Sequence, residues 1–297
     1  MAGSFASIDL SQLPMPDVVE QIDFEKLFAA ALADLIARYP EFSALVESDS
    51  AYKVLEVCTF REVLVRQRCN EAARAVLLAY AEKADLDNLG AVFGVVRLML
   101  DPGNPAEGIP PTMEGDPDFR YRITLAPEGY SVAGPEGAYI YHTRSADPAV
   151  LDASATSPSP GEVVVTVLSR VGDGTASAAL LATVAAAVNA ENVRPLTDHV
   201  TVQSASIVDY QVVGTRYTYA GPDSAVVLAA SDASLQNYIT TCHKLGLDVT
   251  FSGLCGAIMV QGMQRVDLTA PAANIVIDRT HASFCNGINL TYGGVAE

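Results

Sequence analysis

The sequence has no tryptophan, no long apolar run and only 18 lysine and arginine residues. Its most apolar stretch, residues 176–188, is shorter than the 18 or more residues of a membrane span. The opening MAGSFASIDL lacks a basic region followed by an apolar core, so it does not predict a secretory signal. We therefore expect no membrane insertion and a protein assembled in the cytoplasm of the cell that makes it.

The shortage of basic residues also bears on binding partners. Against 18 basic residues stand 35 acidic ones, for a net charge of −17, and no cluster of lysine or arginine occurs. Because such a chain repels a phosphate backbone along its whole length, nucleic-acid binding is disfavoured.

Motifs for catalysis and for metal or cofactor binding are missing too. There is no phosphate-binding loop, no His-Glu-x-x-His and no Cys-x-x-Cys. Asp85 and Asp87 lack the rest of a calcium loop, and we interpret them as capping groups at the start of a helix. We predict a non-enzymatic protein with no cofactor and no catalytic or metal site.

The cysteines and histidines are widely separated. Without a predicted secretion signal, we expect the cysteines to be reduced, small and mostly buried. Adjacent Cys242 and His243 point about 100° apart if the segment is helical, so they do not form a nucleophile–base pair with each other. The residues concerned are Cys58, Cys69, Cys242, Cys255, Cys285, His142, His199, His243 and His281.

Residues 17–97 have a helical pattern. It predicts helices over 17–39, 49–82 and 85–93, the last ended by Gly94. The long helix carries two apolar stripes, and a helix that is apolar on more than one face needs several neighbours. We therefore predict a helical bundle with a partner protein. The candidate interface residues are Leu55, Phe60, Val63, Leu64, Leu77 and Tyr80.

Residues 101–115, DPGNPAEGIPPTMEG, predict a linker. A helix over 116–126, with Arg120 and Arg122 on its solvent side, and one over 134–144 follow, and 154–161 predicts a further loop. Beyond this the pattern alternates between strands and helices. Strands are predicted at 163–168, 200–202, 208–219, 249–251, 265–268, 274–278 and 288–292, and helices at 177–189, 234–245 and 253–260.

The predicted fold class is α+β, in which a helical bundle segment precedes mixed α/β modules with largely antiparallel strands. The predicted domains are an N-terminal arm at 1–16, a partner-bundling helical domain at 17–100, a linker with short helices at 101–160, and α/β modules at 161–225 and 226–297. Residues 151–297 hold only 18 charged groups. Either Thr, Ser, Asn and Gln solvate this half or other subunits cover it, and we favour the second because interface cores are poor in charge.

Five stretches, in order, resemble the J-like baseplate proteins of contractile phage tails and phage-derived R-type tail bacteriocins. No single stretch is specific, but their shared order and spacing are. They are LLAYAEKADLDNLGAVFGVVR at 77–97, FRYRITLAPEGYSVAGPEGAYIY at 119–141, SPSPGEVVVTVL at 157–168, NVRPLTDHVTV at 192–202, and VQGMQRVDL at 260–268 together with NIVID at 274–278.

The resemblance implies a structural wedge subunit of a contractile-tail baseplate. Such subunits surround the central hub and spike, bind a tail protein I-like partner as well as copies of themselves, and contact other baseplate, hub and sheath proteins. The resemblance also implies that they help to close a six-fold ring whose rearrangement triggers sheath contraction. Two alternatives remain: a hydrolase-like enzyme that uses Cys242 or a carboxylate pair, and a receptor-binding tail module, which the low aromatic content disfavours.

Overall fold

The computed structural model describes residues 10, 13, 14, 16–42, 46–221 and 223–296. Most of the predicted arm at 1–16 lies outside these residues. The chain divides into two compact units. Among the described residues, the helical unit contains those from Leu10 to Arg97 together with Gly115–Arg120, and the mixed unit contains Leu98–Glu114 and the chain from Tyr121 onward. Helices accompany antiparallel and parallel strands, so the predicted α+β class is confirmed.

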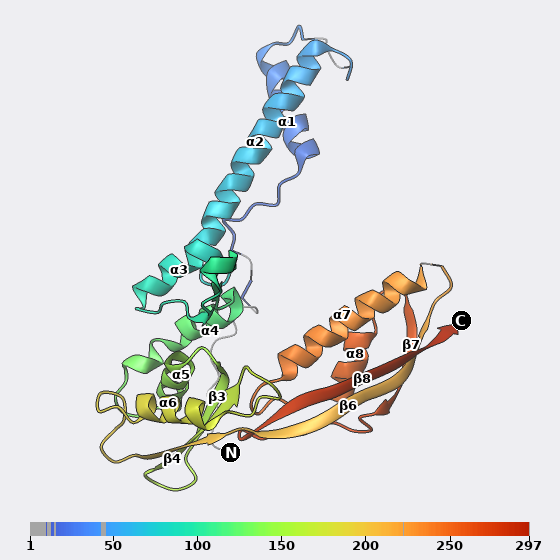
Figure 1. Cartoon of the computed structure of the whole chain (residues 1–297). Helices are drawn as coiled ribbons and strands as arrows, with labels where there is room; N and C mark the ends of the chain where they lie inside the picture. Colours follow the sequence, from blue (N-terminus) through green and yellow to red (C-terminus); the bar gives the residue numbers. More distant parts are fainter. Residues whose placement is uncertain (1–9, 11–12, 15, 43–45, 222, 297) are drawn as a thin grey trace. The chain divides into compact units, whose positions relative to one another are not determined.

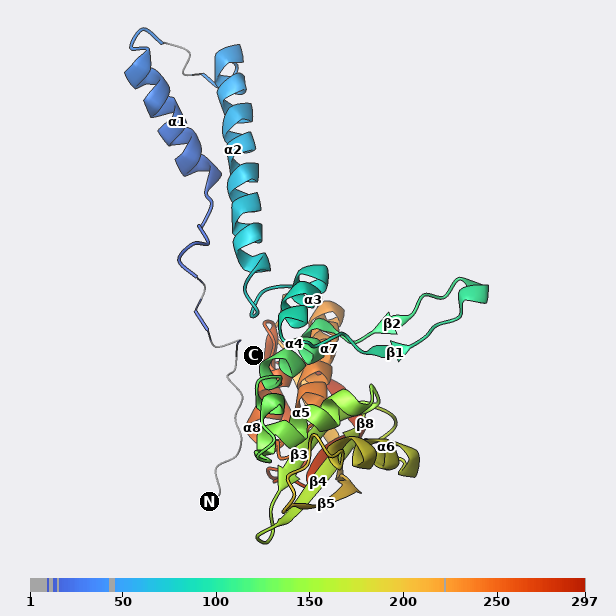
Figure 2. The same ribbon diagram turned by 90° about the vertical axis from the view of Figure 1, so that its left-hand side faces the viewer.

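The helical unit is built on a pair of helices that lie side by side (Figures 1 and 2). The buried ring of Phe28 packs against Tyr52 with 4.8 Å between the ring centroids. Each helix begins at an aspartate whose side chain accepts a backbone N–H bond, Asp23 for the first and Asp49 for the second. The helices of this unit are α1 (Phe24–Arg38), α2 (Ser50–Ala75) and α3 (Lys83–Val92).

Two helix boundaries differ from the prediction. The first helix begins at Phe24 rather than at residue 17, because Asp23 is its cap. The second ends at Ala75 rather than at residue 82. Beyond it, the Arg120 side chain donates hydrogen bonds to the carbonyl oxygens of Leu78 and Ala81, at 2.7 and 2.6 Å. These bonds stabilise a non-helical path for residues 77–81.

The first part of the mixed unit contains a three-stranded sheet, in the order β3-β4-β5, packed against helices. The β3–β4 pair is antiparallel and the β4–β5 pair is parallel. Val165, Val167 and Val184 are fully buried in the core between the sheet and α6. The elements are α4 (Asp116–Leu125), whose first turns belong to the helical unit, α5 (Glu136–Ala146), β3 (Val150–Thr156), β4 (Glu162–Ser169), α6 (Ala178–Val188) and β5 (His199–Ser204).

A short antiparallel sheet takes up much of the linker predicted at 101–115: β1 (Met99–Asp101) leads into it and β2 (Thr112–Met113) lies near its end, with a 3-10 turn at Pro105–Glu107 between them. Figure 2 shows this excursion clearly. A second 3-10 turn, Glu128–Tyr130, follows α4.

The second part of the mixed unit is another three-stranded sheet, in the order β7-β6-β8, with α7 and α8 over one face (Figure 1). The central strand pairs antiparallel with β7 and parallel with β8. Leu235, Leu254 and Ile258 fill the core between helices and sheet. The elements are β6 (Ser206–Thr218), α7 (Ser224–Cys242), α8 (Phe251–Ile258), β7 (Met263–Ala270) and β8 (His281–Val295).

Several predictions for this half of the chain are wrong. Strand β3 occupies residues that were predicted in part as a loop, and α7 begins at Ser224 rather than at residue 234. Residues 249–251 do not form a strand, because Thr250 caps α8 by accepting a bond from the Gly253 N–H. Residues 274–278 have one isolated bridge, between Val249 and Ile275.

Candidate protein–protein interface

Helix α2 has two contrasting sides. Tyr52 faces α1, where its ring meets Phe28, and Thr59, two turns further along the same side of α2, is almost completely buried. On the same side, Arg66 forms an ion pair with Glu20 at 2.7 Å, and the Asn70 side chain donates to the Glu20 carbonyl. These contacts join α2 to α1 and to the segment before α1.

The other side of α2 is an exposed apolar face. At about 100° per residue, its members extend from a flank about 80° round the helix from Tyr52, at Phe60, to the side opposite Tyr52, and the exposed Arg61 lies among them. Their exposed fractions range from 41% for Leu64 to 64% for Val54. Because monomeric proteins rarely expose contiguous apolar patches, this surface is typical of a protein–protein contact. We name it the α2 face, and it consists of Val54, Val57, Phe60, Leu64 and Val65.

The six predicted interface residues divide between these environments. Phe60 and Leu64 belong to the α2 face. Leu55, Val63 and Leu77 are half-buried, and the half-buried Tyr80 hydroxyl lies 3.4 Å from the Leu13 and Pro14 carbonyl oxygens. Their part in binding a partner stays a prediction. Val54, Val57 and Val65 were not among the six. The available signal was the helical spacing of Val57, which stands three residues after Val54, three before Phe60 and eight before Val65.

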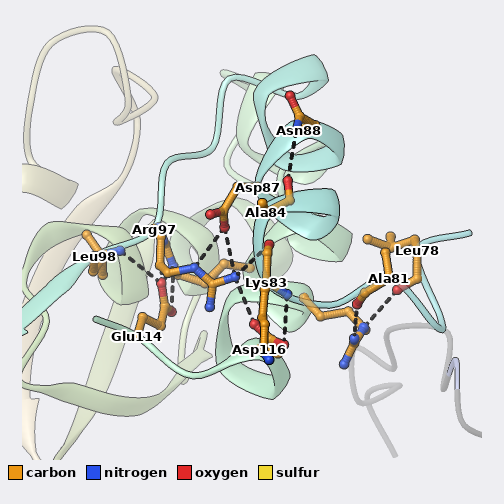
Figure 3. A network of polar contacts seen from close by, with 12 residues as sticks. Leu78, Ala81, Lys83, Ala84, Asp87, Asn88, Arg97, Leu98, Glu114 and Asp116 are labelled. Atoms are coloured by element: carbon orange, nitrogen blue, oxygen red, sulfur yellow. Dashed lines mark hydrogen bonds and ion pairs between the residues drawn. The ribbon is translucent and has the colours of Figure 1, made fainter. Parts of the chain in front are cut away.

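A polar network fixes the segments that follow α2 (Figure 3). The Arg97 guanidinium lies 2.8 Å from carboxylate oxygens of both Asp87 and Asp116, and 4.6 Å from the centroid of the Phe119 ring. Asp116 also accepts a bond from the backbone N–H of Lys83. Asp87 was predicted as a capping group, but it serves as an ion-pair partner here. The network joins α3 to the first turn of α4.

Burial alone raises the pKa of Asp116, but the Lys83 N–H and the nearby Arg97 and Arg120 together bring that pKa below its ordinary value. The charged form of Asp116 is therefore the one that stabilises the fold. This stabilisation is complete above about pH 4 and is lost as the pH falls further.

The variant D116N is therefore expected to unfold at pH 7 with a free energy about 1 kcal/mol below the parent. The difference should shrink at pH 3, where the parent carboxylate is becoming protonated. Urea unfolding followed by circular dichroism at both pH values measures it. D85N, which neutralises an exposed carboxylate on α3, is the control. A deficit of equal size at both pH values would contradict the assignment.

The mixed unit contains a buried ion pair at the base of the β1–β2 excursion. The Glu114 and Arg122 side chains are 3% and 4% exposed, and hydrogen bonds of 2.9, 3.2 and 2.7 Å join them. The Glu114 carboxylate also accepts the Leu98 N–H, and Arg122 donates to Ser145. The prediction that Arg122 faces solvent is wrong, because Glu114 draws it into the interior.

The cysteines and histidines form no catalytic arrangement among the described residues. Burial raises the pKa of the Cys242 thiol, which opposes the formation of a thiolate. The His243 Nδ1 atom lies 2.6 Å from the Ser283 carbonyl oxygen, so backbone engages it. Cys58 and Cys69 are exposed, and of the five free cysteines only Cys242 is buried, so the prediction of mostly buried cysteines is wrong.

No group of three or more potential metal ligands occurs among the described residues. Within the same residues, each helix is too short or too polar to cross a membrane.

Comparison with known proteins identifies the family. Residues 47–104 match the baseplate J-like N-terminal domain, and residues 131–204 match the baseplate J-like central domain. Baseplate protein J of Escherichia phage P2 is 50% identical over 300 residues, which are 98% of this chain and 99% of that protein. This chain belongs to the baseplate J-like family. The resemblance seen in the sequence is thereby confirmed.

The baseplate J-like matches place known domains on both units. The N-terminal domain match contains α2 and α3, and the central domain match contains α5, α6 and the first three-stranded sheet. A chain from the cryo-EM structure of the anti-feeding prophage (AFP) baseplate, six-fold symmetrised, is 12% identical with a TM-score of 0.42. That match covers 60% of this chain and 44% of the other. Membership in a structural protein family favours a non-enzymatic role.

Proposed function

We propose that this chain is a structural wedge subunit of a contractile-tail baseplate. It assembles around the central hub and spike and takes part in the rearrangement that triggers sheath contraction. The observation that carries the proposal is 50% identity along nearly the whole length of Baseplate protein J from phage P2. Its place of action is the baseplate of a phage or tail-like particle, assembled in the bacterial host cytoplasm.

The α2 face supports a division of labour between the two units. Five large apolar side chains of α2 are exposed, and a stable partner helix would bury them. The proposed partner is a tail protein I-like subunit, bundled with the helical domain at residues 17–100. The charge-poor part of the chain, with its modules at 161–225 and 226–297, makes the contacts between neighbouring copies.

Deleting the gene from the phage or prophage that encodes it tests the proposal. The expected result is tails that lack a complete baseplate in negative-stain electron microscopy, with infectivity or killing lost and then restored by a plasmid copy. Particles with complete, contracting baseplates in the absence of the chain would overturn the proposal.

The enzyme alternative makes the opposite prediction for three side chains. Alanine in place of Cys242, His199 or His243, each in a separate variant, is expected to leave particle assembly and infectivity or killing within about twofold of the parent, because the buried thiol and the backbone-bound imidazole are poorly placed for catalysis. A plaque or killing assay with each variant is the measurement. A loss of activity in correctly assembled particles would favour the enzyme.

The receptor-binding alternative predicts that the purified full chain binds to glycans immobilised on an array. Binding no greater than background would count against it.

A further inference from the structure

Strand β8 is an unusually unprotected sheet edge. It is the outermost strand in the order β7-β6-β8, and it is 15 residues long. Among the described residues, backbone covers its outer side only at the start, where Leu245 bridges Ala282 and the Gly246 N–H donates to His281. The remaining edge presents backbone groups that pair readily with another strand.

The composition of β8 lacks the usual protection against such pairing. Proteins blunt sheet edges with charged side chains and proline. Strand β8 contains no Asp, Glu, Lys, Arg or Pro. The opposite edge of the same sheet, β7, carries Arg265 and Asp267 and is followed by Pro271.

The helix above this edge is nearly uncharged as well. Helix α7 packs over β8, and its single charged residue, Asp232, forms an ion pair with the buried Arg216 at 2.6 Å. Helix α7 has 19 residues and β8 has 15. If 18% of them were charged, as in the chain as a whole, they would hold about six charged residues, but they hold one. This flank is therefore poorer in charge than residues 151–297 as a whole, which hold 18 charged groups.

Two irregularities limit the part of the edge that can pair. The register with β6 shifts between Tyr210 and Gln211 and again between Arg216 and Thr218. Between these shifts, Gly287–Tyr292 runs in unbroken register with Gln211–Arg216. This six-residue run is about 20 Å long. Asn289, near its middle, is exposed, and 44% of Ile288 is accessible.

We propose that the β8 edges of two copies pair antiparallel about a two-fold axis near Asn289, joining two three-stranded sheets into one. This inference deepens the proposed function and rests on it, because it names the contact by which the C-terminal module meets a second copy. Backbone hydrogen bonds supply the affinity in such strand addition.

A second copy fits this flank better than a different protein does. Two chains that each carry −17 repel one another, and contact is least opposed where both are uncharged. A basic partner would be attracted to the acidic surface elsewhere on the chain, because this edge carries no charge with which it could pair. The run is also self-complementary, since antiparallel pairing about its middle brings like residues of both copies to the same face.

The test uses the full chain and two independent surfaces. N289D is nearly isosteric and places like charges on both sides of the seam, so it should raise the dimer dissociation constant at least tenfold. T269D, on the opposite edge strand β7, is the matched control.

The variants N289D and T269D are each made alone and in combination with L64E, which adds a charge to the α2 face. Thermal unfolding checks that each variant folds, and N289K repeats the like-charge test with the opposite sign.

Sedimentation equilibrium up to the highest soluble concentration separates the outcomes. The proposal expects L64E to remain a dimer, L64E/T269D to remain one, and L64E/N289D to become monomeric. Monomeric L64E, or dimers of L64E/N289D and L64E/N289K as tight as those of L64E, would overturn the β8 pairing and leave the bundling function standing. If N289D alone is monomeric while the parent is a dimer, the pairing stands and self-association through the α2 face is refuted.

Discussion

The variant E114A is expected to unfold with a free energy about 3–5 kcal/mol below that of the parent. Removing the carboxylate leaves the Arg122 guanidinium buried without its charged partner, because both side chains are almost inaccessible to solvent. The Leu98 N–H loses an acceptor at the same time. Urea unfolding at pH 7, monitored by circular dichroism, measures the difference.

The control replaces both partners. Since a buried ion pair contributes little more than well-packed apolar groups of similar size, E114L/R122M should recover most of the stability that E114A loses. E107Q neutralises an exposed carboxylate in the turn between β1 and β2 and should change stability by less than about 0.5 kcal/mol. An ordinary substitution lowers the free energy of unfolding by about 1 kcal/mol. If E114A lowers it by no more than that, water reaches the ion pair and the argument from burial is wrong.

This ion pair shows where local sequence patterns stop being informative. The spacing of apolar residues correctly predicts a helix over residues 116–126, observed as α4. It wrongly places Arg122 in solvent, because an arginine on a helix is usually exposed. What buries it is Glu114, which lies before the helix, and no periodic pattern registers a partner outside the element.

The missed strand β3 has a similar cause. Its Asp152 and Ser154 are polar and lie next to a Ser- and Pro-rich segment, so the sequence favours a loop. In the fold, Asp152 accepts the Leu245 N–H and Ser154 donates to the Arg279 carbonyl. Both partners come from the second half of the mixed unit, about a hundred residues away in sequence. The β-branched run of β4, in contrast, is sufficient to predict its strand without knowledge of the fold.

The candidate interface was predictable in kind but not in detail. Helical periodicity shows that α2 is apolar on two sides and therefore needs two neighbours. It does not show which side α1 covers. The Phe28 ring packs against Tyr52, which fixes the covered side. Further along that side, Arg66 and Asn70 both bond to Glu20. The opposite side is left exposed.

The double variant F60E/L64E is expected to lose incorporation into the baseplate. Both side chains are substantially exposed, at 54% and 41%, so the isolated chain should fold with nearly unchanged stability. A partner helix on the α2 face would remove two carboxylates from water, at a cost of about 2 kcal/mol or more for each one that is not paired. Affinity for a co-expressed tail protein I-like subunit should fall at least about a hundredfold. Co-purification and electron microscopy of particles from a complemented deletion measure it.

A matched pair of charges on α1 separates this effect from acidity alone. Ala30 and Ala33 are exposed and lie about 200° and about 140° round α1 from Phe28, whose ring faces α2, so A30E/A33E adds two carboxylates to the helical unit outside the α2 face. This variant should assemble normally, at a cost of a few tenths of a kcal/mol from like charges three residues apart. Equal loss of assembly in A30E/A33E would attribute the defect to net charge. Normal assembly of F60E/L64E would remove the α2 face from the partner interface and leave its apolar exposure to a different contact.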